Sequence, residues 1–170
     1  GSGPNGLAAA ITVAREGVSV LVREAAEEAG GGTRSAELTL PGFVHDTCSA
    51  VHPFAVVSPF FRSLPLTAHG LEWIRPPIML AHAMDDGAVA CVYESIERTA
   101  EALGRDSAAY RALLEPLVES WPKIADAVLG PLRWPRHPIA FARFGIRALQ
   151  PAISLARRMF AGDAARALFA

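Results

Sequence analysis

Cysteine and long hydrophobic runs are both scarce in this sequence of 170 residues. The two cysteines, Cys48 and Cys91, belong to no CxxC pair, and a zinc site needs more ligands at a recognisable spacing. We therefore expect two reduced, buried thiols and no metal. No stretch approaches the roughly 20 apolar residues of a membrane span, and no segment has the pattern of a signal peptide. These absences favour a cytoplasmic protein whose contact with membranes is at most peripheral.

Strong charge is also lacking, since the net charge is only −1. The balance is uneven, because seven arginines and a single acidic residue, Asp163, follow Pro131. This basic tail is dominated by Ala, Leu, Ile and Phe, whereas nucleic-acid binding favours Lys and stacking aromatics on a polar face. Hydrophobic residues make up 51% of the chain, which suffices for a sizeable core and argues against disorder. We expect no nucleic-acid partner.

Glycines dominate the start of the chain, where Gly1, Gly3 and Gly6 precede the small, apolar residues 7–11. At this spacing glycines permit a tight turn, a close approach of the backbone to a pyrophosphate, and close packing of a helix on a strand. The helix N-terminus supplies free N–H donors and a positive dipole. The periodicity predicts a helix over 7–16 that ends at Gly17.

A short apolar segment follows, and residues 18–22 are typical of a parallel strand buried on both faces. It leads to Glu24, which lies 18 residues after Gly6. An acidic residue about 20 residues beyond the glycines is the group that holds a ribose 2′-hydroxyl in dinucleotide-binding domains. The alternative is a surface glutamate beside Arg23. The order of turn, helix, strand and acid favours a dinucleotide site.

A second glycine segment, Gly30–Gly32, is followed by Arg34. Such a segment is either a flexible surface loop or a backbone that lies against a flat cofactor or its phosphates. In the second case the Arg34 guanidinium supplies charge-assisted hydrogen bonds.

These motifs together resemble those of the FAD-dependent phytoene desaturase-like oxidoreductases, in the carotenoid and retinoid oxidoreductase group, which is related to the flavin amine oxidases. The segments that carry the resemblance are 1–10, 20–24, 30–35, 40–46 and 52–53. The resemblance implies FAD, with the first glycines at the pyrophosphate, the acid at the adenosine ribose and the second glycine segment beside the flavin. It assigns to the cofactor Gly1, Gly3, Gly6, Glu24, Gly31, Gly32 and Arg34. Flavin carries hydride chemistry itself, so no catalytic side chain is expected.

The resemblance also implies an α/β fold in two parts. Residues 1–66 form a Rossmann-like FAD-binding part, and residues 67–170 form the mixed α+β start of a substrate domain. Family members have a strand ahead of the first glycine and a second cofactor-binding segment near their C-terminus. We therefore expect the chain to be an incomplete portion of the enzyme, inactive by itself.

Turn signals predict two hairpins, one through Pro41-Gly42 and one through Asp85-Asp86-Gly87, with strands at 71–74, 78–82 and 88–93. Adjacent aspartates in a turn diverge, which favours turn formation over metal binding at this second turn. Residues 54–70 are expected to be a loop-rich crossing. Asp46 and His52 allow an acid–base pair, but both residue types are common in loops, and loop roles are favoured.

Helices are expected after Glu94. Ser95 and Asp106 are the predicted N-caps of the first two helices. Pro116 is expected to bend the second helix, and Pro122 is expected to start a third. The tail offers two more, divided at Pro151, whose arginines suggest either a membrane-surface helix or the outer face of a substrate-domain cap. The cap is favoured because the apolar residues are spread around the helix.

The function expected from the sequence is hydride transfer from an apolar, lipophilic small molecule to FAD. Two alternatives remain open. One is a flavin-nucleotide-binding protein without turnover, and the other is a peripheral membrane-binding module that uses the basic tail. The sequence does not determine the oligomeric state or the substrate.

Overall fold

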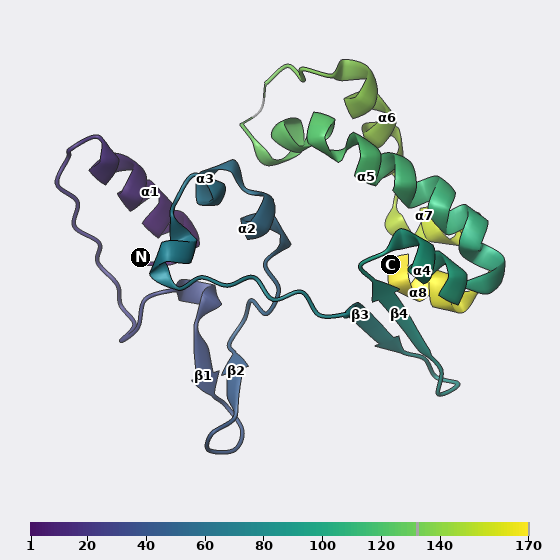
Figure 1. Cartoon of the computed structure of the whole chain (residues 1–170), viewed down its shortest axis with the longest axis horizontal. Coiled ribbons are helices and arrows are strands. Elements are labelled where there is room, and N and C mark those ends of the chain that lie inside the picture. Colours follow the sequence, from purple (N-terminus) through teal and green to yellow (C-terminus); the bar gives the residue numbers. More distant parts are fainter. Residues whose placement is uncertain (132, 170) are drawn as a thin grey trace. The chain divides into compact units, whose positions relative to one another are not determined.

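The computed structural model describes residues 1–131 and 133–169. Its backbone contacts divide the chain into unit 1, Gly1–Trp73, and unit 2, Ile74–Ala170 (Figure 1). The sequence placed this boundary after residue 66. No helix in the described part of the chain is both long enough and apolar enough to cross a membrane.

Unit 1 consists of short elements connected by long loops (Figure 1). In chain order they are α1 (Pro4–Arg15), the 3-10 helix η1 (Gly31–Thr33), β1 (Ser35–Glu37), β2 (Val44–Asp46), α2 (Pro53–Val57), α3 (Pro59–Arg62) and the 3-10 helix η2 (Leu66–His69). Helix α1 confirms the predicted helix, and Gly17 follows it with φ of +77°. Strands β1 and β2 form the predicted antiparallel hairpin, with Ala36 opposite His45.

The strand predicted at residues 18–22 is not formed. No strand in the described chain pairs with this segment, so its backbone has no ladder partner on either side. Its side chains are correspondingly exposed, with Leu21 84% accessible. The prediction was wrong because a continuous apolar run marks a strand only where neighbouring strands cover it.

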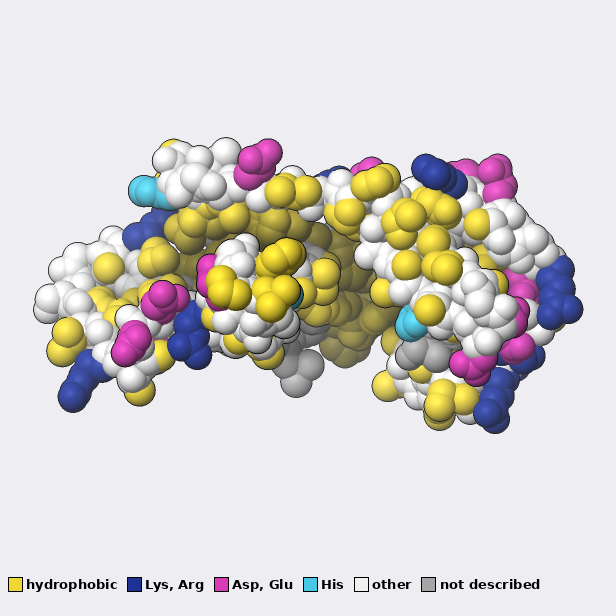
Figure 2. Space-filling model, turned by 90° about the horizontal axis from the view of Figure 1, so that it is seen from below, with side chains coloured by type: hydrophobic (Ala, Val, Ile, Leu, Met, Phe, Trp, Pro, Cys, Tyr) yellow, Lys and Arg dark blue, Asp and Glu magenta, His cyan; other side chains and the backbone are white. Residues whose placement is uncertain are grey.

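Unit 1 has almost no buried interior. Among its described residues only Ser2 is buried, with 4% of its surface accessible, and α1 has no buried residue. Large hydrophobic side chains such as Leu21, Phe43 and Phe54 are exposed, and hydrophobic atoms are visible on the surface of both units (Figure 2). Polar contacts of the glycine segments therefore matter more to unit 1 than apolar packing does.

Unit 2 joins a hairpin to a group of helices. Its elements are β3 (Ile78–Ala83), β4 (Val89–Tyr93), α4 (Ile96–Ala102), the 3-10 helix η3 (Gly104–Asp106), α5 (Ser107–Leu129), α6 (Pro138–Ala148), α7 (Ala152–Met159) and α8 (Asp163–Phe169). The predicted hairpin of β3 and β4 is confirmed, and the Asp86 side chain accepts a hydrogen bond from the Ala88 N–H in its turn. The strand predicted at 71–74 is absent, since those residues pair with no described strand.

The hairpin is tied to α4 by a buried threonine. Thr99 is fully buried, its Oγ1 accepts a hydrogen bond from the Tyr93 N–H at 2.9 Å, and its hydroxyl donates to the Ser95 carbonyl at 3.0 Å. Ser95 caps α4 as predicted, because its Oγ accepts from the Arg98 N–H at 3.1 Å. The end of β4 and the start of α4 are thus fixed together.

The core of unit 2 lies among α4, α5, α7 and α8. Its buried members are Ala100, Leu103, Tyr110, Leu113, Ala156, Phe160 and Ala165. Burial raises the pKa of the Tyr110 phenol above its usual range, with a smaller opposing effect from a hydrogen bond to Thr99. Pro151 separates α6 from α7 as predicted, whereas the loop-rich crossing expected at 54–70 contains α2 and α3.

Helix α5 runs without a break through Pro116 and Pro122, so the separate third helix predicted from Pro122 is wrong. A proline inside a helix removes one N–H and frees the carbonyl four residues earlier. The carbonyl freed by Pro116 is that of Ala112, and it accepts a hydrogen bond from Arg147 Nη1 of α6 at 3.3 Å. The cost of Pro116 is therefore partly offset by a contact that holds α6 on α5.

Asp106 does not cap α5 as predicted, because its side chain bonds elsewhere. Its carboxylate, 4% exposed, accepts hydrogen bonds from the N–H groups of Ala161 at 2.8 Å and Gly162 at 2.7 Å. A Cβ on Gly162 would lie 2.8 Å from Asp106 Oδ2, so glycine is needed for this approach. The contact fixes the turn between α7 and α8 against the start of α5.

We expect Asp106→Ala to lower the free energy of unfolding of unit 2 by roughly 2–4 kcal/mol, because the N–H groups of Ala161 and Gly162 lose a charged, buried acceptor. Urea denaturation followed by circular dichroism measures this change. Asp126→Ala is the matched control, since Asp126 forms only exposed ion pairs with Arg133 and Arg136, and we expect a loss of roughly 0–1 kcal/mol. Equal losses in the two variants would contradict the structural role of Asp106.

Candidate functional site

The N-terminus of α1 presents free backbone donors. Gly3 is the N-cap without a side-chain hydrogen bond, Pro4 follows it, and the first intrahelical bond runs from the Leu7 N–H to the Gly3 carbonyl at 2.9 Å. The N–H groups of Asn5 and Gly6 precede that bond and have no intrahelical acceptor. Together with the helix dipole, they make this end of α1 suited to a phosphate.

The glycine segments are packed so closely that side chains would not fit at two positions. Between the segments, a Cβ on Gly31 would lie 2.9 Å from Gly3 Cα, and within the first segment a Cβ on Gly6 would collide with the Gly1 carbonyl oxygen. Gly31 also has φ of +58°, a left-handed conformation that glycine adopts without strain. The Gly30 N–H donates to the Ser2 carbonyl at 3.0 Å, which joins the segments directly.

The carboxylate of Glu24 is bound to the first glycine segment. Oε2 accepts hydrogen bonds from the N–H and the hydroxyl of Ser2, both at 2.7 Å. Oε1 accepts from the N–H groups of Ala25 at 2.9 Å and Ala26 at 3.0 Å. These bonds, that of the Ser2 N–H foremost, lower the pKa of Glu24 from its ordinary 4.5 to about 2. The side chain is therefore a fixed anion at neutral pH.

Arg34 is hydrogen-bonded to the second glycine segment. Its Nε donates to the Gly31 carbonyl at 2.9 Å, while its own carbonyl accepts from the Thr47 N–H at 2.9 Å. Gly32 contributes its carbonyl to the Ser49 N–H at 2.9 Å. Both Nη groups of Arg34 lack a hydrogen-bond partner among the described residues, so they are available to an anion.

The structure brings most of the predicted cofactor residues to one place. Gly3 meets Gly31 by close approach, Gly6 packs on Gly1, and a Cβ on Gly1 would lie 3.8 Å from Glu24 Oε2. Gly32 and Arg34 belong to the same segment as Gly31 and extend it toward the β1–β2 hairpin.

Asp46 and His52 are held by separate partners. Asp46 Oδ1 accepts from the Ser35 hydroxyl at 2.9 Å, and His52 Nδ1 lies 3.4 Å from Ser49 Oγ. They share no hydrogen bond within the described residues, which leaves the loop roles as the better interpretation.

Cys48 is exposed, contrary to the expectation of a buried thiol, and Cys91 is partly buried. Cys48 lies on the loop beside Gly32, where a Cβ would be 3.7 Å from its Sγ, and this loop has no core to cover it. No group of three His, Cys, Asp or Glu side chains that could hold a metal is present in the described chain.

Two residues of the site were not predicted. Ser2 supplies two of the donors to Glu24, and Gly30 supplies the N–H that reaches the Ser2 carbonyl. A serine between glycines has no recognisable pattern of its own. The only signal in the sequence was that both residues lie within the two glycine segments.

Glycine backbone, a helix N-terminus and a fixed carboxylate meet here, an arrangement that Rossmann-like dinucleotide sites also have. Comparison with known proteins agrees, because residues 1–64 match the family described as NAD(P)-binding Rossmann-like domain. The chain therefore has such a domain at its N-terminus, within a mixed α/β structure.

Among curated proteins, the chain is similar to one of the subunits of limonene dehydrogenase from Castellaniella defragrans (strain DSM 12143 / CCUG 39792 / 65Phen). The two are 31% identical over 107 residues, which make up 63% of this chain and 19% of the relative. The match thus spans about a fifth of that relative's length. No solved structure matches the chain.

We expect Ser2→Ala to raise the pKa of Glu24 from about 2 toward 4.5, because one of the hydrogen bonds to the carboxylate is lost. The rise should be incomplete, since the backbone donors remain. Carboxyl carbon chemical shifts followed by NMR over a pH titration measure it.

The low pKa of Glu24 also predicts a pH dependence. The folded-state pKa is lower than the ordinary value, so the stabilisation by ionised Glu24 is complete above pH 4.5 and is lost as the pH falls toward 2. In Ser2→Ala the stabilisation by ionised Glu24 should be smaller than in the unchanged protein, so less stability is lost as the pH falls. An unchanged Glu24 titration in that variant would refute the role of the Ser2 hydroxyl.

Proposed function

We propose that this chain is the cofactor-binding portion of an FAD-dependent oxidoreductase that removes hydride from an apolar substrate. The observation that supports it most is the convergence of both glycine segments with the Glu24 carboxylate. The match to a Rossmann-like domain and the similarity to part of a dehydrogenase support the same class of reaction.

The carboxylate of Glu24 bears on the choice of dinucleotide. A fixed anion accepts the hydroxyls of an unmodified ribose and repels a 2′-phosphate, which favours FAD or NAD over NADP. The preference for FAD within that pair rests on the second glycine segment and on the resemblance to flavoproteins. Gly31 lies against Gly3, and the free Nη groups of Arg34 extend the polar surface beyond the first loop.

The proposed roles of the residues are binding and orientation. The Asn5 and Gly6 N–H groups would hold the pyrophosphate, and Glu24 would hold the adenosine ribose. All four acceptor directions of Glu24 are already used by its own chain, so a ribose hydroxyl would replace the one side-chain donor, the Ser2 hydroxyl, which can rotate to another acceptor.

FAD, when bound, would supply a hydride acceptor for a hydrogen on a substrate carbon. A second substrate hydrogen would leave as a proton to solvent. The substrate is proposed to be an apolar hydrocarbon. The name of the curated relative makes limonene a reasonable first compound to assay.

We expect the purified protein to bind FAD more tightly than NAD⁺, and NAD⁺ more tightly than NADP⁺, in isothermal titration calorimetry. Glu24→Ala should weaken FAD binding at least about tenfold, because a charge-assisted contact to ribose is lost and the glycine loop is loosened. Glu27→Ala is the matched control, since Glu27 is exposed on the same loop. Tighter binding of NADP⁺ than of FAD would refute the proposal, as would equal FAD affinity in both variants.

A further inference from the structure

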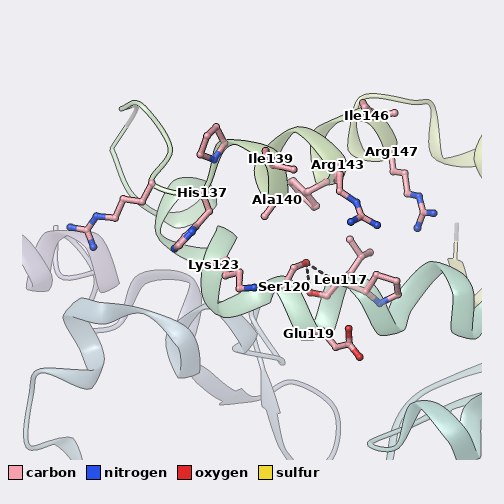
Figure 3. Close-up of a pocket in the computed structure, with 14 residues that line it drawn as sticks. Leu117, Glu119, Ser120, Lys123, His137, Ile139, Ala140, Arg143, Ile146 and Arg147 are labelled. Atoms are coloured by element: carbon pink, nitrogen blue, oxygen red, sulfur yellow. Dashed lines mark hydrogen bonds between the residues drawn. The ribbon is translucent and has the colours of Figure 1, made fainter.

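A groove in unit 2 lies between α5 and α6, far along the chain from the glycine segments (Figure 3). Its volume is about 980 Å³, at the upper end of the roughly 300–1,000 Å³ typical of small-molecule pockets. The apolar part of its lining consists of Leu117, Ile139, Ala140, Phe144 and Ile146. Apolar side chains from both helices therefore form a surface on which a hydrocarbon chain could lie.

Positive charge surrounds this apolar surface. Lys123 from α5 and Arg143 and Arg147 from α6 line the groove, as does Arg136 ahead of α6. The acidic residue of the lining is Glu119, which Figure 3 shows on the side of α5 turned away from α6. The interior of the groove thus has a strong excess of cations.

Two of these cations already have partners. Arg147 donates to the Ala112 and Leu113 carbonyls, and Arg136 pairs with Asp126 at 3.5 Å. Lys123 and Arg143 form no ion pair within the described residues. They come from opposite helices, and Figure 3 shows the Arg143 guanidinium between α6 and α5. Unneutralised cations facing an apolar groove favour an anion that also has an apolar part.

We propose that this groove binds a single molecule of an acidic amphiphile, with a carboxylate or phosphate head and a hydrocarbon chain. The head is held by Lys123 and by the planar donors of Arg143, which suit the oxygens of either anion. The chain lies along Leu117, Ile139 and Phe144. This site is distinct from the dinucleotide site, and it requires no activity of unit 1.

The groove favours a single bound molecule over a bilayer surface, because its cations and apolar side chains line a concavity between two helices. The exposed arginines of α7 do not belong to this lining. Arg157 is one of them, and a change of its charge leaves the groove intact.

The test measures binding of dodecyl phosphate, kept below its micelle concentration, to the full chain by isothermal titration calorimetry. We expect saturable binding that weakens with added salt, and binding of the uncharged dodecanol at least about tenfold weaker. Lys123→Glu combined with Arg143→Glu should weaken dodecyl phosphate binding at least about tenfold. Arg157→Glu combined with Arg158→Glu is the charge-matched control, since both arginines lie outside the lining, and it should change the affinity less than about twofold.

A second variant tests the groove without altering charge. Ala140→Trp fills the space between the helices, and we expect it to abolish binding of dodecyl phosphate while circular dichroism confirms the native helix content. Equal affinity for dodecanol and dodecyl phosphate would overturn the proposal, as would unchanged affinity in the Lys123 and Arg143 variant. Binding only to vesicles that contain phosphatidylglycerol, with none to monomeric dodecyl phosphate, would identify a membrane surface instead and would also overturn it.

Discussion

The hydrogen bonds between the Glu24 carboxylate and Ser2 hold the site of unit 1 in shape. This unit has almost no buried apolar core among its described residues, so the hydrophobic effect contributes little to fixing its loops. Glu24 instead uses both carboxylate oxygens to bind backbone and side-chain donors on the first glycine segment and on its own loop. The second segment is joined through Gly30 to the same Ser2. The residues proposed to bind a nucleotide therefore also organise the site in its absence.

The sequence predicted features that depend on neighbours along the chain. Gly17 ends α1, Ser95 caps α4, Pro151 separates α6 from α7, and the Asp85-Asp86-Gly87 turn connects β3 to β4. Each is decided by the φ preference or hydrogen bonding of one to three residues, so the local pattern suffices. The spacing of the glycines and Glu24 was equally readable, because the same spacing recurs in dinucleotide-binding domains.

Other features depend on residues distant in sequence and were predicted incorrectly. Asp106 has a good capping position, but its carboxylate bonds to Ala161 and Gly162, more than 50 residues away. Residues 18–22 have strand composition, yet a strand exists only with a paired neighbour. In both cases the local preference is a weak free energy, and the partner available in the fold decides the outcome. Ser2 was missed for the same reason, because its partner Glu24 is known only once the loop is folded.

Proline in α5 shows how a distant partner can offset part of a local cost. Pro116 removes an N–H and leaves the Ala112 carbonyl without its helical donor. Arg147 of α6 donates to that carbonyl, which provides a docking point for the next helix. Nη1 of Arg147 is committed to α5 in this way. In the proposed site Lys123 and Arg143, which form no ion pair within the described residues, bind the anion, while Arg147 holds α6 on α5.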